Sequence, residues 1–571
     1  MLTPQFRRWL LTAALALVAI ALHAAADPRP NIVVVMTDDQ DYGDLGIHGN
    51  PHIRTPNLDR FGREGVQLTR FYVAPVCAPT RASLLTGRYH YRTGILHTSR
   101  GGAKMHGDEA TIAEFLRDAG YRTGIFGKWH LGDNIPMRPS DQGFAESLIH
   151  KSGGIDQGPD HPNSYFDPRL WHNNQPQKTS GYCTDVFFSA ALQFIEQNRD
   201  QPFFVYLPTN APHTPLQVSP RYSDRYKAMG LDDTTAKVYA MVENIDENFG
   251  RLMATLDRLD LRRNTVVVFL TDNGAQQSRF SAGQRGRKGT VYEGGIHVPC
   301  FWQWPARFDG RRTIDRVAAH IDLLPTLLEV AGVPPATGRP LDGRSLLPLL
   351  ARPTPTERWP ERTVFLQVHR GLEPKKYQHF AAVTQQFKLI GHPGTFNRED
   401  LDPAKVPPPL ELYDLSSDPG EKNDLAAKHP EVVTRLRREY EAWFESVRRE
   451  RQFLPGVIHI GSPAEPEAEL SRYQDGGYPG GIKTGWRVKV LRGGIYDATF
   501  NRGVHGGAAQ LVVSWQGKTS RVPLAAGKNQ AALNLGAGEG ILDIWLESPA
   551  GKRLDYEGND SNGDPTLRWR G

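Results

Sequence analysis

The chain has 571 residues, of which 39% are hydrophobic and 23% are charged, and its formal net charge is +5. These values are typical of a globular protein with a large core and about two domains. The small net charge permits an acidic substrate, and with no basic-aromatic repeat in the sequence we expect no nucleic acid partner.

The first residues predict an export signal. Arg7 and Arg8 precede an apolar run from Trp9 to Leu22, and the alanines at 24–26 fit a small-residue cleavage site. The run is short for a membrane span. We therefore expect a signal peptide at residues 1–26, a mature chain without stable membrane insertion, and a periplasmic or secreted location. An uncleaved anchor is the alternative.

Three cysteines are present, at Cys77, Cys183 and Cys300. Exported proteins usually pair their cysteines, and an odd number leaves at least one thiol without an intramolecular partner. A disulfide between Cys183 and Cys300 is left open by the sequence.

The apolar run 31–37 predicts a strand that is buried on both faces of a mostly parallel sheet. Asp38 and Asp39 follow it directly. Open α/β sheets bind their ligands at the carboxyl ends of their strands. The two acids therefore favour a metal site over a simple polar loop.

The segment 76–88 predicts a short helix that begins at Pro79 or Thr80 and ends at Gly87. Cys77 would lie at its N-terminus, where backbone N–H groups favour negative charge, and Arg81 would add a cation one turn further on. This arrangement suits an anion beside a reactive side chain. The alternative is that Cys77 is a small buried hydrophobic residue.

Further elements alternate along the chain. A helix is predicted at 111–119 with a capping box, followed by a strand at 121–126. If that strand continues, Lys128 and His130 project to the same side. A second buried strand at 203–207 leads to His213, which stands between two prolines.

An amphipathic helix with apolar positions between 238 and 256 precedes a third buried strand at 265–270. This strand ends in Asp272 and Asn273, as the first one ends in Asp38 and Asp39. Parallel pairing would bring these four side chains to one sheet edge. Hard oxygen ligands without His or Cys favour Ca²⁺ or Mg²⁺ over Zn²⁺.

The later sequence adds a glycine-rich loop and a change of composition. The loop 286–299 contains Lys288 but no Walker-type ending. Short strands are predicted at 363–368 and 380–383, and an amphipathic helix at 431–451. After 455, period-two runs predict a small antiparallel β-sandwich that either binds sugar or braces the rest of the chain.

Together these patterns predict an α/β fold with a large, mostly parallel sheet sandwiched by helices. We assign residues 27–350 to the main domain, 351–454 to an α+β subdomain and 455–571 to the appended antiparallel β-sandwich.

Six motifs in order, between residues 30 and 450, resemble those of the type I sulfatases of the alkaline phosphatase superfamily. They are Thr-Asp38-Asp39-Gln, Cys77-Ala-Pro-Thr-Arg81 with Leu-Leu-Thr-Gly87-Arg, Gly-Lys128-Trp-His130, Ala-Pro-His213-Thr-Pro, Thr-Asp272-Asn273-Gly, and Lys288-Gly with Glu293-Gly-Gly.

The resemblance implies an alkaline phosphatase-like fold and a sulfatase that uses formylglycine. A maturation enzyme would oxidise Cys77 to the aldehyde, whose hydrate attacks sulfur and forms a covalent sulfate before the aldehyde re-forms. By the same resemblance Ca²⁺, with Mg²⁺ as the alternative ion, is held by a set that we list as Asp38, Asp39, Cys77, Asp272 and Asn273.

The resemblance also gives roles to the remaining motif residues. Arg81 and Lys128 would position the hydrate, and His130 would act as the base for sulfate release. His213 and Lys288 would contact the sulfate, with His213 protonating the leaving oxygen. Asp41 and His297 depart from the family pattern, since glycine and arginine are usual there, and we expect any effect on the substrate side.

Export and the appended module favour a sulfated sugar or glycan over a simple aryl sulfate as substrate. Two alternatives remain: a phosphatase or phosphodiesterase of the same superfamily, and a non-catalytic glycan-binding protein. A cysteine-dependent phosphatase is excluded because its Cys-x5-Arg spacing would need arginine at Ser83.

Overall fold

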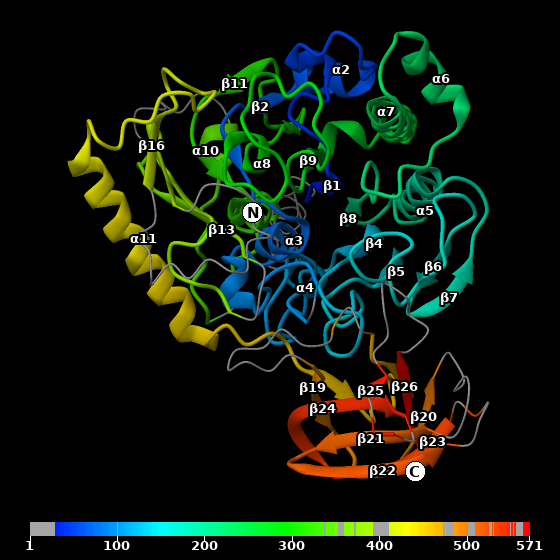
Figure 1. The fold of residues 1–571 in the computed structure, drawn as a ribbon. Coiled ribbons are helices and arrows are strands. Elements are labelled where there is room, and N and C mark those ends of the chain that lie inside the picture. Colours follow the sequence, from blue (N-terminus) through cyan, green and yellow to red (C-terminus); the bar gives the residue numbers. More distant parts are fainter. Residues whose placement is uncertain are drawn as a thin grey trace, which may run out of the picture.

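The protein is described here by a computed structural model, which covers residues 29–99, 101–335, 338–351, 359–369, 373–391, 410–471, 474, 484–500, 509–524, 528, 530–548, 550–551, 553–554 and 564–570. The predicted signal peptide lies outside these residues. A ten-stranded sheet forms the centre of the molecule (Figure 1). Its spatial order is β11 (Arg312–Ile314), β2 (Val66–Leu68), β10 (Cys300–Gln303), β9 (Thr265–Thr271), β1 (Asn31–Thr37), β8 (Phe203–Pro208), β4 (Arg122–Lys128), β5 (Glu146–His150), β6 (Arg169–His172) and β7 (Gln175–Lys178).

The middle of this sheet is parallel. β9, β1, β8, β4 and β5 pair in parallel, whereas β10, β6 and β7 join their neighbours antiparallel. The three apolar strands predicted from the sequence are therefore adjacent in space. The carboxyl ends of all five parallel strands lie at one edge of the sheet, and the predicted site residues that follow β1 and β9 lie there.

Helices cover both faces of the sheet, because each central strand is buried on both sides. Along β1, Val33 and Val35 face one core, while Ile32 and Val34 face the other. The first core includes residues of α2 (Pro56–Glu64), α5 (Cys183–Gln197) and α7 (Asp233–Arg258). The second includes residues of α3 (Cys77–Thr86), α4 (Ile112–Asp118), α9 (Leu323–Ala331) and α10 (Leu347–Leu350).

Smaller elements complete this part of the chain. α6 (Pro220–Ala228) packs on α7, and α8 (Glu293–Ile296) is a single turn near the carboxyl end of β9. β3 (Phe71–Tyr72) and β12 (Ala318–Ala319) form a two-stranded parallel sheet. Short 3-10 turns lie at 46–48, 90–93, 262–264 and 320–322.

A four-stranded antiparallel sheet follows in the chain, with β13 (Val364–Gln367), β14 (Phe380–Val383), β15 (Phe387–Gly391) and β16 (Leu410–Asp414). The amphipathic α11 (Pro430–Arg451) packs on it through Leu436, Tyr440 and Phe444. The predicted strands and helix of this region are confirmed.

The last segment forms two packed sheets at one end of the molecule, drawn in orange and red in Figure 1. One contains β17 (Ile458–Ile460), β19 (Trp486–Val490), β24 (Gly538–Glu547), β21 (Ala509–Trp515), β22 (Lys518–Leu524) and β25 (Arg553–Leu554). The other contains β18 (Glu467–Glu469), β26 (Pro565–Trp569), β20 (Gly494–Phe500) and β23 (Gln530–Leu535). The predicted sandwich is confirmed, with one correction, because β17 pairs parallel with β19.

Two local predictions also need correction. The helix that carries Cys77 begins at Cys77 itself, and Gly87 ends it in the left-handed conformation with φ of 66°. The strand before Lys128 stops there, since His130 has a φ of 61°, so Lys128 and His130 do not lie on one extended strand.

The open question about the cysteines has a clear answer. Cys77, Cys183 and Cys300 are all buried free thiols, so no disulfide joins the last two. No helix in the described ranges is both long and apolar enough to cross a bilayer.

Candidate active site

Two parallel strand ends build the floor of the site. β1 and β9 pair in register up to Thr37 opposite Thr271. The next two residues of each strand are therefore neighbours, and all four are almost fully buried: Asp38, Asp39, Asp272 and Asn273. The side chains touch, because Asn273 Nδ2 donates to Asp39 Oδ1 over 2.7 Å. The predicted juxtaposition is present.

Arg81 lies one turn into α3 and joins the two strand ends. Its Nη2 is 2.7 Å from Asp272 Oδ2 and 3.3 Å from Asp38 Oδ2, and its Nε donates to Asp272 as well. A further bond to the carbonyl of Lys128 ties in the end of β4. The guanidinium is fully buried, so it acts as a fixed cation under the carboxylates.

Two lysines complete the positive charge. Lys128 Nζ lies 2.5 Å from Asp38 Oδ2, and Lys288 Nζ lies 2.5 Å from Asp39 Oδ1. Lys288 reaches the site on a loop that folds tightly against the end of β9. A Cβ on Gly274 would lie 1.8 Å from the carbonyl oxygen of Gly294, so only glycine permits this approach.

The buried oxygens of the predicted ligand set fit a hard cation. Asp38 Oδ1, Asp39 Oδ2 and Asn273 Oδ1 are buried and accept no hydrogen bond from the described residues. Buried polar atoms are normally satisfied, and three unsatisfied oxygens from two strand ends are ligands of the kind that Ca²⁺ and Mg²⁺ take. These residues could hold the ion.

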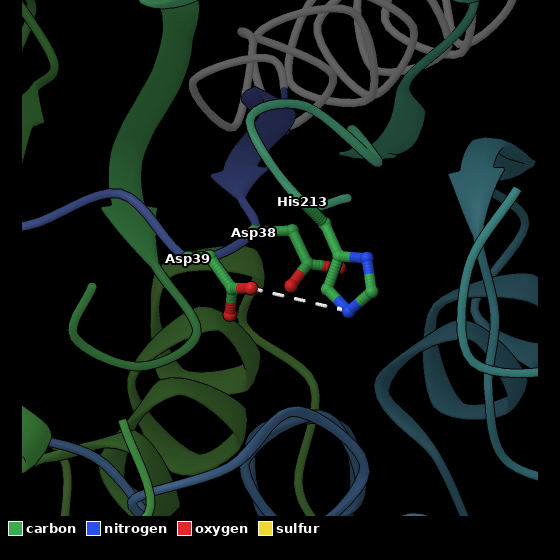
Figure 2. Close-up of side chains that lie close together, drawn as sticks. All are labelled: Asp38, Asp39 and His213. Carbon is green, nitrogen blue, oxygen red and sulfur yellow. Dashed lines mark ion pairs between the residues drawn. The ribbon is translucent and has the colours of Figure 1, made fainter. Parts of the chain in front are cut away.

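His213 also faces this group. Its Nε2 lies 3.9 Å from Asp39 Oδ2, and together with Asp38 it forms a cluster that could hold a metal (Figure 2). Nδ1 is 2.7 Å from the carbonyl of Thr214, so Nδ1 carries the proton and Nε2 has the lone pair. Burial, together with the nearby Lys288, lowers the pKa of His213 to about 4. Sequence reasoning did not place His213 this close to the ligand carboxylates.

His130 is a second histidine that has one ring nitrogen available to accept a proton. Its Nε2 is 2.8 Å from the carbonyl of Thr98, whereas Nδ1 has no hydrogen-bond partner among the described residues. Burial and the charge of Lys128 lower its pKa well below the usual value. The ring is therefore neutral, and its free Nδ1 can accept a proton.

The carboxylates differ in their protonation. Burial alone would raise the pKa of Asp38, but Lys128, His213 and Arg81 hold it well below its usual range. Burial and the repulsion of Asp38 raise the pKa of Asp272 to about 7. A divalent cation would relieve that repulsion.

Cys77 is the first residue of α3 and is buried beside this charged group. Burial raises the pKa of its thiol, although Lys128 and Lys288 act in the opposite direction. The sulfur is therefore protonated at neutral pH and is a poor nucleophile as it stands. This excludes the simple thiolate that a helix N-terminus first suggests.

Ser152 is a site residue that sequence reasoning missed. It is buried with φ of 60°, and its Oγ has no hydrogen-bond partner in the described part of the chain. The next two glycines lie against the rings of His130 and His213, each closely enough that a Cβ would come within about 3 Å of the ring. Ser152 follows β5, a strand that the sequence did not predict, at the same sheet edge.

The two departures from the family pattern contact the protein itself. Asp41 Oδ1 accepts the backbone N–H of Gly43, and its own N–H donates to Asp44, which also pairs with Arg279. His297 is held by Glu293 and by stacking on the ring of Tyr42. Neither side chain joins the carboxylate cluster.

The sequence analysis also did not identify Arg279. It pairs with Asp44 and donates from Nη2 to the carbonyl of Asp39 over 3.0 Å. These two contacts hold the loop that follows β1 in place. No motif marks an arginine in this position.

Comparison with known proteins agrees with this geometry. A family model described as Sulfatase matches residues 30–333, and one described as N-sulphoglucosamine sulphohydrolase, C-terminal, matches 287–446. The chain is 34% identical to arylsulfatase A of Homo sapiens over 472 residues, which cover 74% of this chain and 89% of the relative. It is 33% identical to N-acetylgalactosamine-6-sulfatase of Canis lupus familiaris over 379 residues, covering 59% and 69%.

Among solved structures, that of Ps i-CgsB in complex with k-i-k-neocarrahexaose superposes with a TM-score of 0.64 at 27% identity and covers 75% of this chain and 95% of that one. Both family models end before the two C-terminal sheets. The matched core, the ten-stranded sheet and the buried site at its carboxyl edge place this chain in the sulfatase family, as a sulfuric ester hydrolase.

Proposed function

We propose that this enzyme removes sulfate from a sulfated carbohydrate after Cys77 has been converted to formylglycine, with Ca²⁺ bound at the strand ends. One observation supports the mechanism: the buried Cys77 thiol stands beside three cations and three unsatisfied buried oxygens. The glycan substrate is supported by the relatives, which include N-acetylgalactosamine-6-sulfatases and a protein solved with a neocarrahexaose.

The nucleophile and the metal would have separate roles in the reaction. In the proposed enzyme the hydrated formylglycine at position 77 would supply the attacking hydroxyl. Bound Ca²⁺ would act as a Lewis acid on a sulfate oxygen, held by Asp38, Asp39, Asp272 and Asn273. Lys128 and Lys288, which pair with Asp38 and Asp39, would then be available to contact the hydrate and the sulfate, respectively.

The histidines move protons. Each presents one ring nitrogen with a free lone pair, Nε2 of His213 and Nδ1 of His130. A bound sulfate ester places negative charge beside His213, which raises its pKa and favours the protonated ring. His213 then donates to the leaving oxygen, and His130 accepts the proton that accompanies sulfate release.

The test is sulfate release by protein co-expressed with a formylglycine-generating enzyme. Wild-type protein should release sulfate from an aryl sulfate and, faster, from a member of a sulfated oligosaccharide panel. Cys77→Ala should abolish release, while Cys183→Ala, which removes another buried thiol, should retain it. Equal rates for wild type and Cys77→Ala would refute the mechanism.

Two further measurements separate the alternatives. Intact-mass analysis of the Cys77 peptide should detect the aldehyde, whereas an unmodified thiol in a maturation-competent host would favour a glycan-binding protein. Faster turnover of phosphate esters than of sulfate esters would favour the alternative hypothesis of a phosphatase or phosphodiesterase. For the proposed export, N-terminal sequencing of the secreted or periplasmic protein should begin near Asp27.

A further inference from the structure

The loop that follows β5 contacts both histidines of the site. A Cβ on Gly153 would lie 2.8 Å from the ring of His130, and a Cβ on Gly154 would lie 3.0 Å from the ring of His213. The backbone of residues 152–154, which we call the histidine loop, therefore packs directly against both rings. A displacement of this loop would change where the two rings lie.

A buried acid holds the histidine loop. Ser152 has a φ of 60°, and a residue other than glycine keeps this conformation only when neighbouring contacts hold it. The N–H of Ser152 donates to Asp133 Oδ1 over 3.2 Å, and the N–H of Lys151 donates to Asp160 Oδ2 over 2.9 Å. Asp133 lies in the loop after β4, so this carboxylate joins the neighbouring strand end to the histidine loop.

The second oxygen of Asp133 is bound by the C-terminal sandwich. Gln474 Nε2 donates to Asp133 Oδ2 over 3.1 Å, and both side chains are buried. The N–H of Gln474 donates to the carbonyl of Ser471, which also accepts from Trp486 Nε1 of β19. From the main domain, the buried Lys104 donates from Nζ to the carbonyl of Gln474 over 3.0 Å. Gln474 is therefore fixed at the point where the sandwich meets Asp133.

Other contacts seat the sandwich on the same two loops. Glu469 pairs with Lys151 at 3.3 Å, and its carbonyl accepts from Asn134 Nδ2 over 3.1 Å. Lys151 and Asn134 are the chain neighbours of Ser152 and Asp133. Both family models end before the sandwich, so this support of the site comes from outside the matched core.

We propose that Gln474 is a positioning residue for the sulfatase reaction. Through Asp133 it holds the histidine loop, and this loop sets where the rings of His130 and His213 lie. The inference rests on the proposed function, in which these two rings move protons. Proton transfer requires reacting atoms within hydrogen-bond reach, so a small displacement of the rings lowers the rate of the reaction more than it weakens substrate binding. The C-terminal sandwich thereby supports the reaction through a direct contact with the main domain.

Gln474→Met tests the contact, because it removes the donor and nearly keeps the side-chain volume. The assay measures kcat and KM for para-nitrophenyl sulfate, with kcat expressed per formylglycine as measured by intact mass. We expect kcat to fall about tenfold and KM to stay within about twofold of the wild-type value.

Gln303→Met is the matched control. Gln303 is also buried, and its Nε2 donates to the carbonyl of Phe61 over 2.8 Å. It pairs with Val267 near the amino end of β9, away from the site. This variant loses a buried hydrogen bond of the same kind, and its kcat should equal that of wild type.

An exchange of donor and acceptor tests the pair itself. Gln474→Glu alone places a second carboxyl group against Asp133 and should lower kcat at least as much as Gln474→Met. Adding Asp133→Asn supplies an amide that can accept from Ser152 and donate to the new carboxylate, so kcat should return to within about threefold of wild type. The proposal is refuted if Gln474→Met keeps the wild-type kcat, if Gln303→Met lowers kcat equally, or if the exchange variant stays as slow as Gln474→Glu.

A measurement without turnover separates this inference from the proposed function. The ring signals of His130 and His213 are recorded by NMR in protein with isotope-labelled histidine and are assigned from His130→Gln and His213→Gln. Both signals should shift in Gln474→Met and keep their wild-type positions in Gln303→Met. Unchanged signals in Gln474→Met overturn the inference. Shifted signals in a protein whose wild type releases no sulfate support the positioning and overturn only the proposed reaction.

Discussion

Replacing Arg81 by methionine tests whether a buried cation holds the two strand ends together. The guanidinium contacts Asp272 at 2.7 Å and Asp38 at 3.3 Å, and all three side chains are fully buried. Methionine fills much of the same volume but leaves Asp272 without that partner. Removing one member of a buried ion pair costs about 3–5 kcal/mol, because the remaining charge stays out of water.

We expect the free energy of unfolding of Arg81→Met to be lower than that of wild type by about that amount, measured by urea denaturation at neutral pH in the presence of a chelator. Arg435→Met is the control, since Arg435 is an exposed residue of α11 in an i,i+4 pair with Glu439. The free energy of unfolding of Arg435→Met should stay within about 0.5 kcal/mol of the wild-type value.

A double-mutant cycle isolates the pairwise energy. Asp272→Asn removes the charge that Arg81 compensates, so the double variant should be destabilised by less than the sum of the single variants, with a coupling of at least about 1 kcal/mol. The reasoning is wrong if the single changes add within about 0.5 kcal/mol, since the guanidinium would then contribute only through packing.

Three further predictions concern the metal, a buried acid and the thiols. A chelator should lower Tm and stop sulfate release, and Ca²⁺ at a hundredfold excess over Kd should restore both, with about 2.7 kcal/mol of stabilisation; an unchanged Tm contradicts the metal site. Burial raises the pKa of the Glu465 carboxyl to about 7 in the folded protein, above its ordinary value of 4.5. The free energy of unfolding should therefore be highest below pH 4.5 and should fall by at most about 3 kcal/mol as the pH rises to 7. Glu465→Gln should flatten that slope in pH-dependent denaturation, and an unaltered slope would assign it to other groups. A reductant should leave Tm unchanged, because Cys183 and Cys300 are free thiols; a lower Tm would indicate a disulfide.

The floor of the site was predictable because its two halves are local patterns. Each strand is a continuous apolar run that ends in acid or amide side chains, and parallel pairing brings such ends together. β1 and β9 pair as this rule requires. The same local signals fixed the capping box of α4, where Thr111 and Glu114 bond as predicted.

What the sequence did not reveal depends on contacts between distant residues. Ser152 has no motif of its own and is recognisable only through the two glycines that lie against His130 and His213. Gln474 donates to Asp133 across 341 positions of the chain, so no local pattern links the sandwich to the loop beside the site. The start of α3 at Cys77 rather than Pro79 is a smaller error, of the size usual for helix ends.

The charges of the site favour joint binding of the proposed Ca²⁺ ion and a sulfate ester. Asp38 and Asp39 pair with Lys128 and Lys288, and Arg81 pairs with Asp272, so the carboxylates and cations of the site compensate one another. A divalent ion alone would displace the lysines and leave their charges unpaired in a buried site, which is costly. A sulfate ester alone would meet carboxylates as well as cations. If both bind as proposed, the ion would take the carboxylates and the sulfate would lie near the lysines, so each ligand would remove the electrostatic cost of the other. Ca²⁺ should accordingly bind more tightly in the presence of inorganic sulfate, and by linkage sulfate more tightly with Ca²⁺. Calorimetric titration of Ca²⁺ with and without sulfate, repeated on Lys288→Ala, measures this coupling. Equal Ca²⁺ affinity in both conditions would show that the two ligands bind independently.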